Sequence, residues 1–463
     1  MYKIDFAKPV HAYFVGIGGI SMSGLALILK DAGFTISGSD RSESELTEGL
    51  KAHGIPVFIG QRRENITPDI DVAILTAAIG TDNPEAVALR EMNIPTLTRA
   101  QLLGQLMLNY RTPVAVSGTH GKTTTTSMIS QILMDADLDP TLSVGGMLPS
   151  IGGNLRIGHS EYFVAEACEY TNSFLDFFPR IGLILNVEAD HLDFFKDLED
   201  IRHSFHRFAL LLPEDGTLVI GASIPRYREL TEGVKGRILT FGPEPADEYG
   251  APVDAYPEEI TYDKLGCASF TAVCGSERMQ VKLSVPGSHN ILNALAAIAC
   301  CRALGLTEEQ ILSGLAAFGG TDRRFQHKGS FAGVTVIDDY AHHPTEISAT
   351  LAAASRVDHK RLFVVFQPHT YTRTKALLPE FAEALSAADR VVLADIYAAR
   401  EKNTVGISSA DLRDAIRARG KECEYFPSFE EIEDYFRKNC QEGDLLITMG
   451  AGDVYKIGEA LLS

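Results

Sequence analysis

The stretch AVSGTHGKTTTTS, residues 115–127, joins a short apolar run to a glycine loop and a threonine-rich helix start. This order places backbone N–H groups and the ammonium group of Lys122 at a helix N-terminus, where the helix dipole favours bound anions. A loop of this kind holds nucleotide phosphates, with the lysine on the outer phosphates and the Thr123 hydroxyl on Mg²⁺. The spacing is shorter than in the common pattern, because Gly118 and Gly121 enclose only two residues. A chance turn explains Gly118 but not Gly-Lys followed by four threonines, and we predict a phosphate-binding loop.

The composition is that of a globular protein with room for about three domains in 463 residues. The N-terminus lacks a signal-peptide pattern, and no segment approaches the ~20 apolar residues of a membrane span. The seven cysteines, an odd number without paired C-x-x-C spacing, argue against a disulfide framework and against a zinc site. A net charge of −19 argues against nucleic-acid binding. We expect a cytoplasmic protein without membrane or nucleic-acid partners, a monomer or weak homodimer.

The first segment, HAYFVGIGGISMSGLALILKDAGF at 11–34, predicts a strand, a glycine turn and a helix. A second strand follows and ends at Asp40, which completes the element order of a dinucleotide-binding fold. The glycines differ from the dehydrogenase fingerprint, because Ser21 stands where the third glycine belongs. The segment therefore predicts a site for a nucleotide or its pyrophosphate.

In the second segment, which we expect to start with a linker at 111–113, polar residues follow strand-like runs. They are Glu166, Glu169, Asn186, Glu188, Asp190, His191 and Asp193, with His289, Asn290 and Asn293 opening a later apolar helix. Open α/β sheets bind ligands beyond the carboxyl ends of their strands, and Mg²⁺ prefers oxygen ligands. The set therefore indicates a Mg²⁺ environment, although each residue alone could be a turn former or a helix cap.

The third segment, after 318–320, repeats the alternation of strand and helix, and Pro344 is placed to start a helix. Its strands are followed by Asp338, Asp339, Tyr340, His342, His343, His369, Tyr371, Arg373 and Lys375. Since His342 and His343 are adjacent in a loop, we expect at least one of them to face solvent or a ligand.

Together these motifs resemble the Mur ligase family of bacterial cell-wall synthesis, over the whole chain. The motifs are GTHGKTTTT, AEACEYTNSF, ADHLD, GSHNILNALAA and GGTDRRFQ, while GIGGISMSGLA, DDYAHHPTEI, FQPHTYTRT and MGAGDV are nearest to its alanine-adding branch. The resemblance implies an α/β protein of three domains. They are a UDP-sugar-binding Rossmann-like domain at 1–110, a central phosphate-loop ATPase domain at 111–320 and a C-terminal Rossmann-like, amino-acid-binding domain at 321–463.

The resemblance also implies ATP and Mg²⁺ as cofactors, with UDP-N-acetylmuramate and L-alanine as substrates. The implied ATP site is Gly118, Thr119, His120, Gly121, Lys122, Thr123, Thr124, His289, Asn290, Asn293, Arg324, Asp339 and Tyr340. Within it the asparagines and Tyr340 would face the adenine, Asp339 the ribose and Arg324 the phosphates. The implied metal ligands are Thr123, Glu169 and His191, and the UDP-sugar site is Gly16, Gly18, Gly19, Ile20, Ser21 and Asp40. The implied catalytic residues are Lys122, His191, Arg324, His342 and Arg373, the last two at the amino-acid site.

Two departures from the family pattern stand out. AEACEYTNSF replaces the more usual AEADESDASF, so Cys168 and its neighbours dilute the local negative charge. Thr370 stands where some alanine-adding relatives have arginine. By contrast, the stretch IRHSFHRFALLL lacks the lysine that several later ligases carbamylate, which agrees with the alanine-adding branch.

The implied reaction activates the muramyl carboxylate as an acyl phosphate, which the amine of alanine then attacks. Because Lys122 and Arg324 lie on different predicted domains, we expect the site to be complete only after domain closure. Three alternatives remain open at this point: an NAD-dependent oxidoreductase, a nucleotide-gated binding protein, and a murein-recycling ligase that adds a tripeptide.

Overall fold

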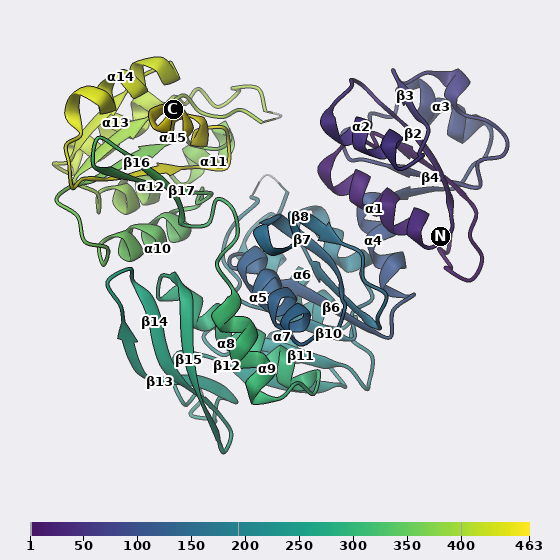
Figure 1. The fold of residues 1–463 in the computed structure, drawn as a ribbon, viewed down its shortest axis with the longest axis horizontal. Coiled ribbons are helices and arrows are strands. Elements are labelled where there is room, and N and C mark those ends of the chain that lie inside the picture. The colour runs from purple at the N-terminus through teal and green to yellow at the C-terminus, as the bar shows by residue number, and fades with distance from the viewer. Residues whose placement is uncertain (1, 193, 400) are drawn as a thin grey trace.

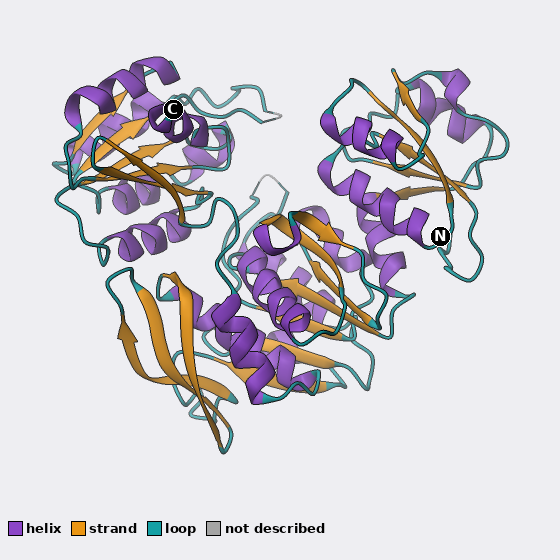
Figure 2. Cartoon of the chain, viewed as in Figure 1, coloured by secondary structure: helices purple, strands orange, loops and turns teal. Residues whose placement is uncertain are grey.

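Three sheets, each with its own helices, follow one another along the chain (Figures 1 and 2). The computed structural model describes residues 2–192, 194–399 and 401–463. In Figure 1 the purple N-terminal unit lies on the right, the central unit below, and the green-to-yellow C-terminal unit at the upper left. The expected α/β class is confirmed.

The N-terminal unit is a five-stranded parallel sheet with the order β3-β2-β1-β4-β5. This order reverses direction beside β1, so the glycine turn after β1 lies at the topological switch point where such sheets bind ligands. The strands are β1 (His11–Val15), β2 (Thr35–Asp40), β3 (Val57–Ile59), β4 (Val72–Leu75) and β5 (Thr96–Thr98). The helices are α1 (Ile20–Asp31), α2 (Glu45–Ala52), α3 (Pro84–Glu91) and α4 (Arg99–Met107).

The central unit is a ten-stranded sheet with the order β15-β14-β13-β12-β11-β10-β6-β9-β7-β8. Its middle is parallel, and antiparallel strands close both edges. The strands are β6 (Thr112–Ser117), β7 (Thr141–Leu148), β8 (Gly153–Arg156), β9 (Tyr162–Glu166), β10 (Ile181–Ile184), β11 (Thr217–Gly221), β12 (Arg237–Phe241), β13 (Ala255–Tyr262), β14 (Cys267–Cys274) and β15 (Glu277–Pro286). The helices are α5 (Lys122–Asp135), α6 (Leu198–Ala209), α7 (Tyr227–Thr231), α8 (His289–Ala303) and α9 (Glu308–Ala317).

The C-terminal unit is a six-stranded sheet with the order β16-β17-β21-β18-β19-β20. All of its strand pairs are parallel except the hairpin β16–β17. The strands are β16 (Gln326–Phe331), β17 (Val334–Asp339), β18 (Leu362–Phe366), β19 (Arg390–Leu393), β20 (Glu422–Tyr425) and β21 (Leu445–Met449). The helices are α10 (Pro344–Ala354), α11 (Tyr371–Ala376), α12 (Leu378–Leu385), α13 (Ser409–Ala418), α14 (Phe429–Asn439) and α15 (Tyr455–Leu462).

The expected linker at 111–113 is wrong, because strand β6 already begins at Thr112 and runs through the middle of the central sheet. Pro113 lacks an N–H group, but its carbonyl accepts a hydrogen bond from the backbone N–H of Arg180 at 2.9 Å. Its neighbour Thr112 donates to the carbonyl of Glu161, also at 2.9 Å. The backbone therefore forms hydrogen bonds with the neighbouring segments on both sides of β6 despite the proline.

The N-terminal and central units share one hydrophobic core, which includes Leu102, Leu106 and Met107 of α4 and Phe163 and Phe177 of the central unit. The two units approach each other closely at Gly104, where an added Cβ would lie 1.9 Å from the carbonyl oxygen of Asp176. Glycine is therefore required at this crossing of helix and loop.

A short linker leads into the C-terminal unit. Arg323 and Phe325 in it have left-handed φ angles of 61° and 50°. The carboxylate of Asp339 accepts a 2.9 Å hydrogen bond from the N–H of Phe325, which fixes this bend. Arg324, between the two left-handed residues, is thereby held at the boundary between the central and C-terminal units.

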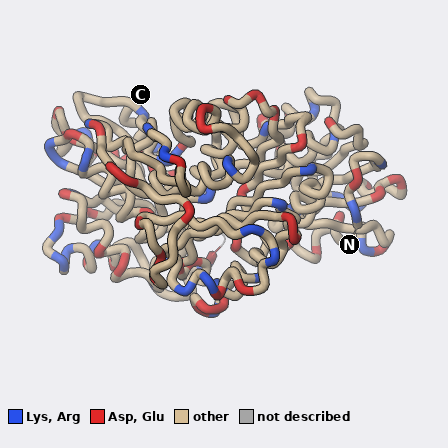
Figure 3. The backbone as a smooth tube through the Cα atoms, turned by 90° about the horizontal axis from the view of Figure 1, so that it is seen from below, with Lys and Arg blue, Asp and Glu red and all other residues tan. Residues whose placement is uncertain are grey.

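Within the described parts of the chain, no helix is long and apolar enough to cross a membrane. All seven cysteines are free thiols, and Cys300 and Cys301 are buried in α8. Acidic and basic positions are interspersed along the chain in Figure 3.

Candidate active site

The phosphate loop connects β6 to α5, as expected, and its two glycines are sterically required. Gly118 and Gly121 have φ angles of +144° and +80°. A Cβ at Gly118 would lie 2.9 Å from the Cβ of Leu185, and one at Gly121 would lie 2.4 Å from the Oδ1 of Asn293. The loop is thus pressed against the β10 loop on one side and the start of α8 on the other.

Lys122 is folded back onto its own loop. Its Nζ donates to the carbonyls of Gly118 and Thr119 at 2.6 and 3.0 Å and to Glu169 Oε2 at 2.9 Å. Burial opposes the charged form, but the Glu169 carboxylate outweighs it and raises the pKa of Lys122. The lysine is therefore a fixed cation at the mouth of the loop.

The expected metal ligands lie around the same point. Thr123 Oγ1 donates to Glu166 Oε2 at 2.8 Å, and His191 Nε2 lies 3.9 Å from Glu169 Oε1. Burial lowers the pKa of His191, so its imidazole is neutral and able to act as a ligand. Hydroxyl and carboxylate oxygens suit Mg²⁺, so Thr123, Glu166 and Glu169 fit the ion chemically. Asp193, also named from sequence, lies outside the described residues.

A cavity of about 580 Å³ opens in front of the loop. Residues from all three units line it, among them Lys122, Arg324, Tyr340, His342 and, from the start of α1, Ile20. Burial lowers the pKa of His342 to about 4, so its imidazole is neutral. Two cations from different units therefore face one space that is large enough for a small ligand.

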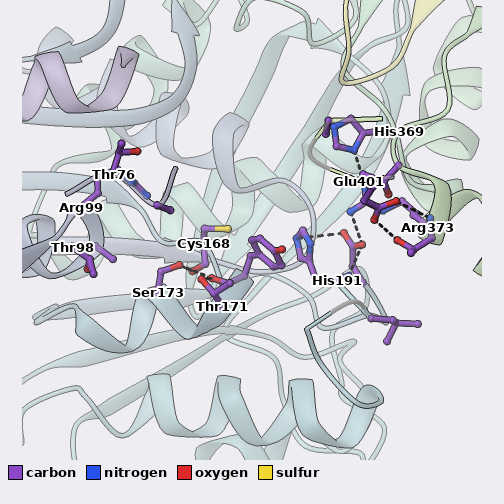
Figure 4. A pocket seen from close by; sticks show the side chains of 18 of the residues that line it. Thr76, Thr98, Arg99, Cys168, Thr171, Ser173, His191, His369, Arg373 and Glu401 are labelled. Atoms are coloured by element: carbon purple, nitrogen blue, oxygen red, sulfur yellow. Dashed lines mark hydrogen bonds and ion pairs between the residues drawn. The ribbon is translucent and has the colours of Figure 1, made fainter. Parts of the chain in front are cut away.

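A second cavity of about 1230 Å³ runs between the three units. Figure 4 shows Thr76, Thr98 and Arg99 of the N-terminal unit on one side. On the opposite side are His369, Arg373 and Glu401 of the C-terminal unit, with the central unit's Cys168, Thr171, Ser173 and His191 between the two groups. Asp190 and His191 line both cavities, so the two spaces meet at these residues.

Polar pairs join the central and C-terminal units at this junction. Arg373 Nη2 donates to Asp190 Oδ1 at 2.9 Å. Although burial opposes it, the guanidinium holds the pKa of Asp190 well below its usual range. His120 Nδ1 lies 3.3 Å from Glu346 Oε1. The neighbouring His342, His120 and Arg324 lower the pKa of Glu346 in spite of its burial. The units already meet around the phosphate loop.

Several residues predicted to bind the nucleotide have structural contacts instead of lining the cavity. Asn293 donates to Asn290 Oδ1 at 2.9 Å, and Asn290 donates to the Pro286 carbonyl at 2.7 Å, both behind the loop. Asp339 accepts from the backbone of Phe325 and Ala341, and burial raises its pKa to about 6. His289 is exposed at the start of α8.

The residues predicted for the UDP-sugar lie at the glycine turn of the N-terminal unit. Asp40 Oδ2 accepts a 2.7 Å hydrogen bond from the N–H of Gly18, which closes the turn. Ser21 Oγ accepts a 3.0 Å hydrogen bond from Arg99, which links the turn to the larger cavity. Of this set, Ile20 lines the smaller cavity.

Sequence reasoning missed Arg99, Glu346 and Glu401. Glu346 is found three residues after the N-cap residue His343 of α10, and this capping-box spacing could have revealed it. Arg99 and Glu401 had no such signal. Arg99 is held by its 3.0 Å hydrogen bond to Ser21, which is distant in sequence, and Glu401 accepts a 3.0 Å hydrogen bond from the N–H of Thr372.

Comparison with known proteins agrees with this arrangement. Residues 11–111 match the model "Mur ligase family, catalytic domain", residues 116–301 the "Mur ligase middle domain", and residues 323–452 the "Mur ligase, glutamate ligase domain". The chain belongs to the Mur ligase family. The resemblance inferred from the sequence motifs is thereby confirmed.

Within the Mur ligase family, the chain is 61% identical to the UDP-N-acetylmuramate–L-alanine ligase of Agathobacter rectalis, over the whole length of both chains. A solved UDP-N-acetylmuramate-alanine ligase from Thermotoga maritima superposes with a TM-score of 0.78 at 30% identity, covering 98% of each chain. A murein peptide ligase from Psychrobacter arcticus also superposes, with a TM-score of 0.70 at 25% identity over 98% of each chain.

Proposed function

We propose that this chain joins L-alanine to the carboxylate of UDP-N-acetylmuramate with the hydrolysis of ATP. Its identity with the alanine-adding relatives over the full length supports this reading. The observation that carries it in the structure is the meeting of the two cavities at Asp190 and His191. A phosphate-binding space and a second space lined by all three units share one boundary, which is the geometry that transfer between two bound substrates requires.

ATP phosphates would bind at residues 118–124, between Lys122 and Arg324. Mg²⁺ would be held by Thr123 and Glu169, with His191 binding a second ion or its water, and would neutralise phosphate charge. Lys122 then exchanges its contact with Glu169 for the transferred phosphoryl group. The fixed cations favour attack of the muramyl carboxylate on the γ-phosphorus, which gives an acyl phosphate and ADP.

The amine of alanine attacks the acyl carbon and phosphate leaves. In this step Arg373 would hold the alanine carboxylate, and neutral His342 would orient the amine and accept its proton. Tyr340 would contact the nucleoside. Four further residues would either contact the nucleoside as well or hold its surroundings in place: His289, Asn290, Asn293 and Asp339. The glycine turn at Gly16, Gly18 and Gly19, with Ile20, Ser21 and Asp40, would take the UDP moiety.

We propose domain boundaries near 110 and 320, a cytoplasmic location, and a monomer or weak homodimer. The three sheets and the three matched ranges fit these boundaries. An acyl phosphate must be protected from water, and the contacts between units around Asp190 would serve that purpose.

The test is ADP release by the full-length protein with ATP, Mg²⁺ and UDP-N-acetylmuramate, with one amine added at a time. We expect release with L-alanine, and weaker release with glycine or L-serine, because one methyl group discriminates by only about 1–3 kcal/mol. The murein-recycling tripeptide is the decisive comparison. Release with the tripeptide and none with L-alanine would contradict the proposal and favour the alternative of a murein-recycling ligase.

A further inference from the structure

Three side chains beside the phosphate loop have the composition of a transition-metal site. His120 in the loop, Glu188 after β10 and His343 at the start of α10 each offer one ligand atom, and these atoms lie within 4.8 Å of one another. His343 is buried, and the other two are partly buried. The set differs from the proposed Mg²⁺ ligands Thr123, Glu169 and His191, although the sequence analysis placed Glu188 among the polar residues of the Mg²⁺ environment and His120 in the ATP site.

The free nitrogens of the two histidines are a second, independent observation. His120 Nε2 and His343 Nε2 are both buried and have no hydrogen-bond partner among the residues that the structure describes. An unpaired buried polar group costs about 1–3 kcal/mol, and such groups are rare in native structures. The two rings face each other with centroids 4.9 Å apart. A ligand between them would satisfy both nitrogens.

The spacing suits a small cation with short bonds. His120 Nε2 lies 3.4 Å from Glu188 Oε2. Tetrahedral zinc with bonds of about 2.0–2.1 Å requires neighbouring ligand atoms roughly 3.3 Å apart. A divalent ion between His120 Nε2 and Glu188 Oε2 would fit this distance, and the His343 ring would move closer to complete the set.

The surrounding contacts orient two of the ligands. His120 Nδ1 lies 3.3 Å from Glu346 Oε1, and a carboxylate on the far nitrogen is the usual partner of a metal-binding histidine. Glu188 Oε2 accepts a 2.8 Å hydrogen bond from Thr345 Oγ1. At His343, metal binding would move the ring proton to Nδ1 and give up a long 3.4 Å contact from the N–H of Thr345.

We propose that His120, Glu188 and His343 form a site for Zn²⁺ or a similar late transition metal, with water as the fourth ligand. Two imidazoles and one carboxylate favour such ions over Mg²⁺, which prefers oxygen ligands. Because His120 and Glu188 belong to the central unit and His343 to the C-terminal unit, the ion would clamp the two units together at the phosphate loop. The cysteine spacing gave no sign of this site, since none of its ligands is a cysteine.

The test uses the chelator-treated, full-length protein in saturating Mg²⁺, without ATP or UDP-sugar. We expect one Co²⁺ per chain to give the strong visible absorption of four-coordinate cobalt, and one equivalent of Zn²⁺ to abolish it. Glu188→Gln and His343→Asn should each weaken Zn²⁺ binding at least tenfold. Asparagine at 343 retains a helix-capping side chain, so that variant is expected to fold.

Two matched controls locate the ion. His327→Asn removes an exposed histidine of β16, and His191→Ala removes the proposed Mg²⁺ residue; both should keep the parent affinity for Zn²⁺. The proposal is overturned if Glu188→Gln binds Zn²⁺ as the parent does, if no four-coordinate cobalt forms, or if His191→Ala abolishes binding. Because no substrate is present, failure here leaves the ligase proposal standing.

Discussion

Lys122 has two roles, because the ammonium group that is proposed to stabilise the phosphoryl group also neutralises the buried carboxylate of Glu169. Only 3% of the Glu169 side chain is exposed, and its contact with Lys122 is 2.9 Å. Removing one partner of such a pair leaves an uncompensated charge, which costs about 3–5 kcal/mol. Activity and stability are therefore coupled at this residue.

We expect Lys122→Ala to lose at least about 10²-fold in kcat for ADP release and also to lower the midpoint of thermal unfolding. The double variant Lys122→Ala/Glu169→Gln removes the unpaired charge, so its midpoint should recover while its activity stays low. Calorimetry and the ADP assay on both proteins separate the two effects. Near-parent turnover in either folded variant would refute the phosphate-loop assignment.

Residues in this part of the site could be predicted because their roles depend on local sequence. Lys122 follows a glycine turn and opens a helix, and Glu169 and His191 follow strands of the same sheet. Arg99 could not be predicted in this way, since its position depends on how α4 packs against another unit. The inward-facing contacts of Asn290 and Asn293 likewise follow from packing behind the loop, which no local pattern specifies.

At the scale of elements, the strand–turn–helix units could be read from the sequence because glycine turns separate apolar runs of different period. The exception is β6, where Arg-Thr-Pro predicts a linker and the structure has a strand. Proline is rare within a central strand, and only the neighbouring strands show that the ladder tolerates it. No local sequence pattern predicts the packing of α4 onto the central unit, although this packing depends on the absence of a side chain at Gly104.

Gly104→Ala should destabilise the joint of the N-terminal and central units by about 1–3 kcal/mol or more, because its Cβ would overlap the carbonyl of Asp176. Gly49→Ala in α2 is the matched control, since a Cβ there has nothing within 4 Å. It should stabilise by about 0.5–1 kcal/mol, as alanine is the better helix former. Urea unfolding compares the two; equal effects would mean that the α4 crossing is not tightly packed.

At the scale of the whole molecule, the pair of Arg373 and Asp190 ties the C-terminal unit to the central one. The pKa of Asp190 is lowered in the folded protein, so the stabilisation is present above the ordinary carboxylate pKa of about 3.9. It is lost as the pH falls from there toward the lower pKa of the folded state. The contact is therefore strong at neutral pH and weakened by acid.

Arg373→Ala should lower the free energy of unfolding by about 3–5 kcal/mol at pH 7, and by clearly less at pH 3. Arg356→Ala is the control, because Arg356 stacks on Tyr262 across the same two units, 4.1 Å from the ring centroid, and has no carboxylate partner among the residues that the structure describes. Its effect should not depend on pH in this way. Urea titrations at both pH values provide the measurement, and a pH-independent effect of Arg373→Ala would contradict the assignment.

The shared core of the first two units has a consequence for the order in which the chain is made. Each sheet uses a continuous stretch of sequence, so the N-terminal sheet can form on the ribosome before the others exist. However, Leu102, Leu106 and Met107 pack against Phe163 and Phe177, which are translated roughly 60–70 residues later. At a translation rate of about 5–20 residues per second, this apolar side of α4 stays exposed for several seconds before the residues that bury it are made. The nascent chain is thus exposed to chaperones and to aggregation during that interval.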